Sequence, residues 1–149
     1  MNDIGRVVID TSSLISAALK VGSVPHLAVD FALAHCTLCA STTTLEELTL
    51  VLSRDKFDRY SPRATRLTFG SLIVQNVLLV SVSPQDESTL NPPCRDPNDN
   101  KFLALAQVAQ ATVLVTSDDD LLCLHPWCGV QILTPAAFVA LIQTQRTTE

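Results

Sequence analysis

The chain has 149 residues, of which 47% are hydrophobic, and a formal net charge of −5. This length fits one domain with a sizeable core, and the hydrophobic content argues against disorder. The negative charge argues against tight nonspecific nucleic-acid binding through bulk charge, but it is compatible with a local basic patch. We therefore predict a single domain over residues 1–149, with a flexible polar tail at 143–149.

The N-terminal segment lacks the pattern of a secretory signal, because Asp3 precedes the first basic residue and Asp10 interrupts the only early apolar run. No apolar run approaches the roughly 18 residues needed to span a bilayer. We therefore expect a cytoplasmic protein with reduced thiols and no membrane partner. The cysteines are expected to be ordinary core or loop residues, because Cys36 and Cys39 would point to opposite faces of a strand; a zinc site is the alternative.

The first predicted element is a short buried strand of β-branched residues, Val7-Val8-Ile9. Asp10 follows it directly, and the hydroxyl residues after Asp10 suit the N-cap of a helix over 13–19. Asp10 is therefore expected at the carboxyl end of the strand, where open α/β sheets place their ligand sites. Because a dry and unpaired carboxylate is costly, Asp10 needs a partner, a cation or water.

The next predicted elements are a helix from Pro25 and a strand at 36–40. A third helix follows, in which Thr43 and Glu46 have the spacing of a capping box. Its buried face is marked by apolar residues at helical spacing, namely Leu45, Leu48, Val51 and Leu52. Glu47 lies on the flank of this stripe, where its carboxylate could reach over the edge of the sheet. The alternative is a solvated surface acid.

A basic segment spans residues 54–66. It holds half of the ten lysine and arginine residues, namely Arg54, Lys56, Arg59, Arg63 and Arg66. One interpretation is a solvated helix-turn-helix surface. The other is a patch that binds nucleic-acid phosphates through Arg54, Arg59 and Arg63, with Tyr60 available for stacking.

A helix then begins after Pro62, and a strand is predicted at 77–82. A proline-containing connection leads to the stretch 96–99, which has the pattern of a helix N-terminus. Asp96 takes the cap position and Asp99 the third helical position. Capping alone would explain both acids, so this alternative stays open. The helix that follows is apolar nearly all round and is therefore expected to be buried on more than one side.

The fourth strand is predicted at 112–116, and a second acid cluster follows it at 117–120. The loop after this cluster contains Trp127 among apolar residues, and we predict an exposed interface patch there. The alternative is a loop that packs back on its own core. The last strand is predicted at 130–133, and the last helix begins at Pro135.

Strands alternate with helices along the chain, so we predict an α/β fold with a mainly parallel sheet and helices on both faces. If the first and fourth strands are neighbours, the chain winds away on opposite sides of them. This arrangement creates a switch point with a crevice. Asp10 and Asp118 both end on that crevice, and Asp99 begins the helix leading to the fourth strand.

The acid-containing stretches, taken in order, resemble the PIN-domain nucleases, and within them the prokaryotic branch related to toxins of toxin–antitoxin pairs (VapC-like). The resemblance covers nearly the whole chain. It is carried by Ile9-Asp10-Thr11-Ser12, Glu47-Leu48 with Arg54, Arg95-Asp96-Pro97-Asn98-Asp99-Asn100-Lys101-Phe102, Thr116-Ser117-Asp118-Asp119-Asp120, and Ile132-Leu133-Thr134-Pro135. The family is similar in fold to a three-layer α/β/α sandwich whose parallel five-stranded sheet has the order 3-2-1-4-5.

The resemblance implies a metal-dependent endoribonuclease that hydrolyses RNA phosphodiester bonds. It gives Asp10, Glu47, Asp99 and Asp118 as the catalytic and metal-binding set, supported by Ser12, Asp96, Thr116 and Asp120. Four carboxylates in one crevice repel each other, and hard oxygen ligands suit Mg²⁺ or Mn²⁺. The implied partners are an RNA substrate, a cognate antitoxin protein, and further copies of the chain in a homodimer or higher homo-oligomer.

Three other functions are weighed against this one. A receiver-like phosphoacceptor domain needs an acceptor acid after the third strand and a late lysine, but Ser81-Val82-Ser83 ends that strand and no lysine follows Lys101. A phosphate-transferring hydrolase with an aspartate nucleophile needs an acid two residues after Asp10, but Ser12 stands there. The remaining alternative is a catalytically silent module of the same fold that binds RNA or assembles with other proteins.

Overall fold

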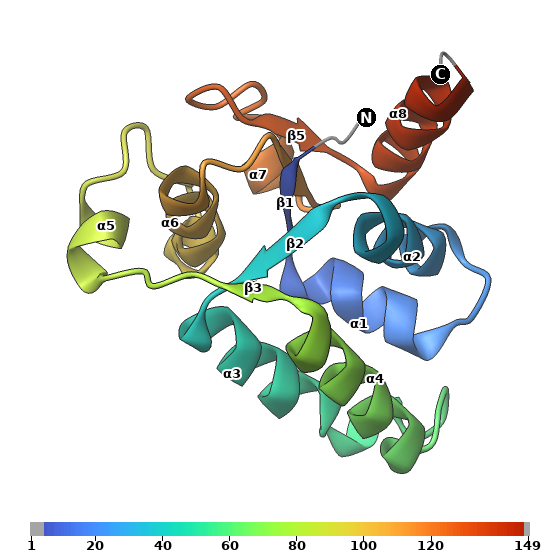
Figure 1. The fold of residues 1–149 in the computed structure, drawn as a ribbon. Coiled ribbons are helices and arrows are strands. Elements are labelled where there is room, and N and C mark those ends of the chain that lie inside the picture. The colour runs from blue at the N-terminus through green and yellow to red at the C-terminus, as the bar shows by residue number, and fades with distance from the viewer. Residues whose placement is uncertain (1–4, 148–149) are drawn as a thin grey trace.

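The computed structural model describes residues 5–147. Its strands are β1 (Arg6–Ile9), β2 (Thr37–Ala40), β3 (Leu78–Leu79), β4 (Val113–Val115) and β5 (Gln131–Leu133). They form a five-stranded sheet of order β3-β2-β1-β4-β5, and every neighbouring pair is parallel (Figure 1). The predicted parallel sheet of order 3-2-1-4-5 is confirmed.

The helices are α1 (Thr11–Leu19), α2 (Val24–His35), α3 (Thr42–Leu52), α4 (Arg63–Asn76), α5 (Pro84–Ser88), α6 (Asn100–Ala109), α7 (Asp119–Leu122) and α8 (Pro135–Thr147). Two short 3-10 helices, η1 (Asp55–Phe57) and η2 (Pro97–Asp99), precede α4 and α6. None of the described helices is by itself long and apolar enough to cross a bilayer. Only α1 and α2 taken together reach that length and composition, and they are bent by 110° at the break between them.

Side chains alternate across the strands and so build a separate core on each face of the sheet. Val7 and Val115 pack on one face with α1, α2, α8 and the inner sides of α3 and α4. Val8 and Leu114 pack on the other face with α6 and α7. Figure 1 shows α6 on one side of the sheet and α2 with α8 on the other, which is the predicted three-layer α/β/α arrangement.

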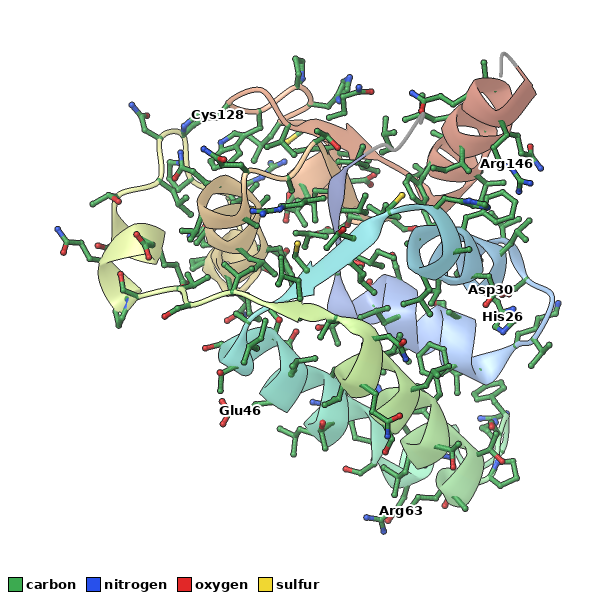
Figure 2. The ribbon with its side chains drawn as sticks, in the orientation of Figure 1. His26, Asp30, Glu46, Arg63, Cys128 and Arg146 are labelled. Carbon is green, nitrogen blue, oxygen red and sulfur yellow. The ribbon has the colours of Figure 1, made fainter. Side chains whose placement is uncertain are left out.

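The start of α3 differs from the prediction. Ser41 is the N-cap, its Oγ accepts from Thr44 N at 3.1 Å, and Thr44 Oγ1 accepts from Ser41 N at 2.9 Å. The predicted capping box of Thr43 and Glu46 is therefore wrong. The pairs Ser41/Thr44 and Thr43/Glu46 have the same spacing. Ser41 and Thr44 are buried whereas Thr43 is exposed, and the buried pair is the one that caps the helix. Glu46 is exposed and points away from the body of the molecule (Figure 2).

One prediction for the C-terminal third is also wrong. Trp127 is only 2% exposed, and its Nε1 donates to Pro92 O at 2.8 Å. The expected exposed interface patch is absent at this residue, and the loop packs on its own core. The tail predicted from residue 143 continues as helix through Thr147, and Arg146 Nη1 lies 3.0 Å from His35 Nε2. The last part of the predicted tail, 148–149, lies outside the described residues.

Candidate active site

The carboxyl ends of β1 and β4 meet at the centre of the sheet, where Ile9 pairs with Val115. The residues that follow these strands are Asp10 and Thr116, and Thr116 Oγ1 donates to Asp10 Oδ2 at 2.6 Å. The same hydroxyl accepts from Asp118 N at 2.9 Å. Thr116 is fully buried. One buried hydroxyl therefore connects the acid after β1 with the backbone of the acid after β4, at the predicted switch point.

Asp10 is a buried carboxylate with two hydrogen-bond donors. It is 3% exposed and is the N-cap of α1, where its Oδ1 accepts from Ser13 N at 3.0 Å. Burial raises the pKa of Asp10, and the charge of Asp118 adds to this, while the hydrogen bonds from Thr116 and Ser13 lower it. The predicted helix start at residue 13 was two residues late, because Asp10 itself caps the helix.

Asp99 and Asp118 form a carboxyl–carboxyl contact. The pKa of Asp99 is raised to about 7, first by burial, then by a hydrogen bond with Asp118 and by the charges of Asp118, Asp96 and Asp10. Two carboxyl groups share a hydrogen bond only when one of them holds a proton. A cation that binds both oxygens must therefore displace a proton that is held up to near-neutral pH.

The other supporting residues lie around this pair in ordinary structural contacts. Asp96 caps η2 by accepting from Asn98 N at 3.0 Å, which is the capping alternative left open by the sequence. Asp120 Oδ1 pairs with Arg95 Nε at 3.0 Å, so its charge is balanced. Ser12 is exposed on the first turn of α1.

Glu47 is held by two residues to which the sequence analysis gave no role. Thr11 Oγ1 donates to Glu47 Oε1 at 2.5 Å, and Lys101 Nζ lies 3.0 Å from Glu47 Oε2. Both partners lie in the stretches that carry the family resemblance, Ile9–Ser12 and Arg95–Phe102. The available signal was a lysine two residues after Asp99, inside a stretch otherwise rich in acids.

A family model described as a PIN domain matches residues 6–120 of the chain. The chain belongs to the PIN-domain family. The matched range contains all four predicted acids, Asp10, Glu47, Asp99 and Asp118. No curated protein matches the sequence significantly.

Three solved structures are similar to this PIN domain in fold. PAE2754 from Pyrobaculum aerophilum is 14% identical with a TM-score of 0.61, and the match covers 95% of this chain and 91% of that one. VapBC2 from Rickettsia felis, bound to a DNA fragment from its promoter, is 13% identical with a TM-score of 0.61, over 85% and 96%. VapC20 of Mycobacterium tuberculosis, a toxin that cleaves the sarcin–ricin loop, is 14% identical with a TM-score of 0.54, over 84% and 98%.

PIN-domain nucleases generally use divalent ions, and the donor chemistry of the three aspartates suits one. Asp10, Asp99 and Asp118 offer carboxylate oxygens, and none of them is in an ion pair with another described residue. Within residues 5–147, however, no three acid, histidine or cysteine side chains already stand in a coordinating arrangement. The residues fit Mg²⁺ or Mn²⁺ in type and charge, and the Asp99–Asp118 contact would have to open to receive the ion.

The basic segment lies apart from the acids. Figure 1 shows it at the ends of α3 and α4 that are far from the sheet, and Figure 2 shows Arg63 pointing into solvent there. Arg54 and Arg59 are also exposed, and the Arg59 guanidinium lies 5.2 Å from the centre of the Tyr60 ring. Arg66 is fully buried and does not belong to the surface patch.

Proposed function

We propose that this PIN domain is a metal-dependent endoribonuclease that hydrolyses RNA phosphodiester bonds. The observation that supports it most is the group of Asp10, Asp99 and Asp118. Three carboxyl groups come together at the ends of β1 and β4 and the start of α6, and burial together with the neighbouring carboxylates raises the pKa of Asp99 to about 7. Proteins seldom keep like charges together without a functional reason. Membership of a nuclease family supports the same activity.

In this proposal, Asp10, Asp99 and Asp118 hold the ion. When bound, a divalent ion supplies Lewis-acid stabilisation of the phosphate charge and lowers the pKa of a bound water. Thr116 and Ser13 fix both oxygens of Asp10, so this ligand is held rigidly before the substrate arrives. Asp99 titrates near neutral pH and can hold or release a proton there. Glu47 fits an ion less well, because its charge is already paired with Lys101.

RNA must approach a chain whose net charge is −5, so local positive charge has to offset the repulsion. Arg54 lies two residues after the end of α3, the helix that carries Glu47. We propose that Arg54, Arg59 and Arg63 hold phosphates that flank the scissile one. Phosphate contacts position an RNA without reading its sequence, so specificity would come from shape or from bases splayed out of a loop.

We also propose that the protein is the toxin of a toxin–antitoxin pair, with a cognate antitoxin as partner. The fold likeness to the Rickettsia felis VapBC2 protein and to the VapC20 toxin supports this. A homodimer or higher homo-oligomer and a cytoplasmic location stay predictions. The surface once expected to form the oligomer is buried at Trp127, so oligomerisation now rests on the family resemblance alone.

A second candidate is a catalytically silent module that binds RNA or assembles with other proteins. The absence of a ready-made coordinating arrangement among the described acids favours it. Incubation of total cellular RNA with Mn²⁺, with and without chelator, separates the two functions. The wild type and Asp119→Asn, an exposed neighbour, should give discrete products that chelator and Asp118→Asn abolish. Cleavage that survives both treatments would indicate a contaminant, and no cleavage of varied RNAs would favour the silent module.

A further inference from the structure

Glu47 and Lys101 form an ion pair next to the aspartates (N–O distance 3.0 Å). We propose that Lys101 binds a phosphate of the RNA and that Glu47 is the positioning residue for its ammonium, not a metal ligand. This inference rests on the proposed function. It assigns a substrate contact to Lys101 of α6, and it makes Glu47 a positioning residue, whereas the family resemblance implied a metal ligand.

The contacts of Lys101 leave it one donor for a ligand. Its Nζ donates to Asn98 O and to Glu47 Oε2, and an ammonium group has three N–H donors. No described residue provides an acceptor for the third. Glu47 is in turn fixed through Oε1 by the Thr11 hydroxyl, so the pair is held from α1, α3 and η2 together. The Lys101 side chain is 15% exposed, which keeps the ammonium accessible but confined.

Glu47 differs from the aspartates because its charge is balanced by an ion pair. Its carboxylate is neutralised by Lys101, whereas the charges that act on Asp99 come from Asp118, Asp96 and Asp10. An ion that took Glu47 Oε2 as a ligand would have to displace Lys101 and leave its ammonium with the Asn98 carbonyl and the Phe102 ring as its remaining contacts. Removing one partner of a partly buried pair in this way is unfavourable.

The surroundings of Lys101 leave room for a ligand. It follows Asp99 by two residues, so it lies on the first turn after the proposed metal-binding acid. It also lines a cavity of about 130 Å³ between the starts of α3 and α5, together with Ser41, Thr43, Val82, Ser83, Pro84 and Glu87. A phosphate next to the scissile one can therefore approach Lys101 while the aspartates hold the ion.

RNA affinity tests the contact without relying on cleavage. In an Asp118→Asn background, Lys101→Gln should weaken the binding of a single-stranded RNA by about tenfold, the worth of one charged hydrogen bond. Lys20→Gln, which removes an exposed lysine elsewhere, should leave the affinity unchanged, and Lys101→Arg should retain most of it. Equal affinities of Lys101→Gln and Lys20→Gln would overturn the proposal.

Calorimetric titration with Mn²⁺ alone tests the role of Glu47. Glu47→Gln should bind Mn²⁺ as the wild type does, whereas Asp99→Asn should bind it at least about tenfold more weakly. Glu47→Gln should also add nothing to the RNA-binding defect of Lys101→Gln, because both changes remove the same contact. A loss of Mn²⁺ affinity in Glu47→Gln as large as in Asp99→Asn would overturn the proposal. A wild type that binds RNA through Lys101 and does not cleave it would overturn only the proposed nuclease.

Discussion

The acid group and the basic segment of this PIN domain both gather charge of one sign, and the structure treats them in opposite ways. Asp10, Asp99 and Asp118 are brought together from three elements, and no described residue balances them with an ion pair. In the basic segment the only buried charge, Arg66, has a hydrogen-bond acceptor at each of its three guanidinium nitrogens. Its guanidinium donates to the carbonyls of Leu52, Arg54 and Ser61 and to Asp58 Oδ1.

This difference shows how burial and partners separate a structural charge from a functional one. The hydrogen bonds of Arg66 offset the cost of its desolvation and stabilise the turn between α3 and α4. No described cation balances the aspartates. Asp10 accepts two hydrogen bonds, but the pKa of Asp99 is raised, first by burial and then by Asp118 and the other nearby carboxylates. A sequence shows only the sign of each charge, so it describes both regions in the same terms.

The largest expected effect comes from removing one of the carboxylates that have no ion-pair partner among the described residues. Asp10→Asn should lower metal-dependent cleavage by more than about 100-fold, because it removes a charged ligand. The melting temperature should hold or rise, because asparagine still caps α1 and like-charge repulsion falls. Cleavage rates and thermal unfolding measure the two effects. Asp30→Asn, which changes an exposed acid on α2, is the matched control (Figure 2). An Asp10→Asn enzyme as active as the wild type would remove the acid group from the mechanism.

The second effect is on stability and comes from the compensated charge. Arg66→Met should cost about 3 kcal/mol of unfolding free energy, because it leaves buried carbonyls without donors. Arg63→Met removes an exposed arginine three residues earlier and should change stability by less than about 0.5 kcal/mol. Urea denaturation measures both. Equal losses in the two variants would mean that the buried network does not hold the turn.

The third prediction concerns pH. The folded-state pKa of Asp99 is raised from 3.8 to about 7, so the native protein binds more protons than the unfolded chain between these values. The stabilisation from this group is fully present below about pH 4 and is lost as the pH rises through about 7. The melting temperature should therefore fall across this range, and less so in Asp99→Asn. Added Mg²⁺ should restore stability above pH 7, because it binds only the folded state.

The Asp96→Asn variant, measured without added metal, is the control for this pH effect. Asp96 also contributes to the raised pKa of Asp99, but less than Asp118 does. Its replacement should therefore leave most of the pH dependence in place. A wild-type melting temperature that is constant from about pH 4 to about pH 7 would show that Asp99 does not titrate abnormally.

The sequence predicted the parallel α/β fold from backbone direction, whereas the strand order 3-2-1-4-5, which makes β1 and β4 neighbours, came from the family resemblance. Alternating strands and helices require a parallel sheet, and adjacent parallel strands end at the same edge, which brings Asp10 and Asp118 together. The partners of Glu47 were not predictable, since they depend on how α1, α3 and α6 pack. Trp127 was misplaced for a similar reason: its indole N–H finds a carbonyl 35 residues away, at Pro92.

The smallest expected effect tests whether the exposed arginines act on RNA at all. Replacing Arg54, Arg59 and Arg63 with Gln should weaken binding to many RNAs alike, since phosphate contacts carry no sequence information. Each phosphate contact on a single strand contributes roughly 0.7 to the slope of log affinity against log salt, so three lost contacts lower it by about 2. Stability should not change, because all three side chains are exposed.

Arg146→Gln is the control for this measurement, because it removes an exposed arginine at the far end of the molecule, on α8 (Figure 2). It should leave the salt slope of RNA binding unchanged. If the triple variant also keeps the wild-type slope, the exposed arginines form a solvated surface, and Lys101 becomes the main protein cation for the phosphates. If the slope falls only in the triple variant, the arginines of the basic segment have two different roles. Arg66 stabilises the turn, and its exposed neighbours bind the substrate.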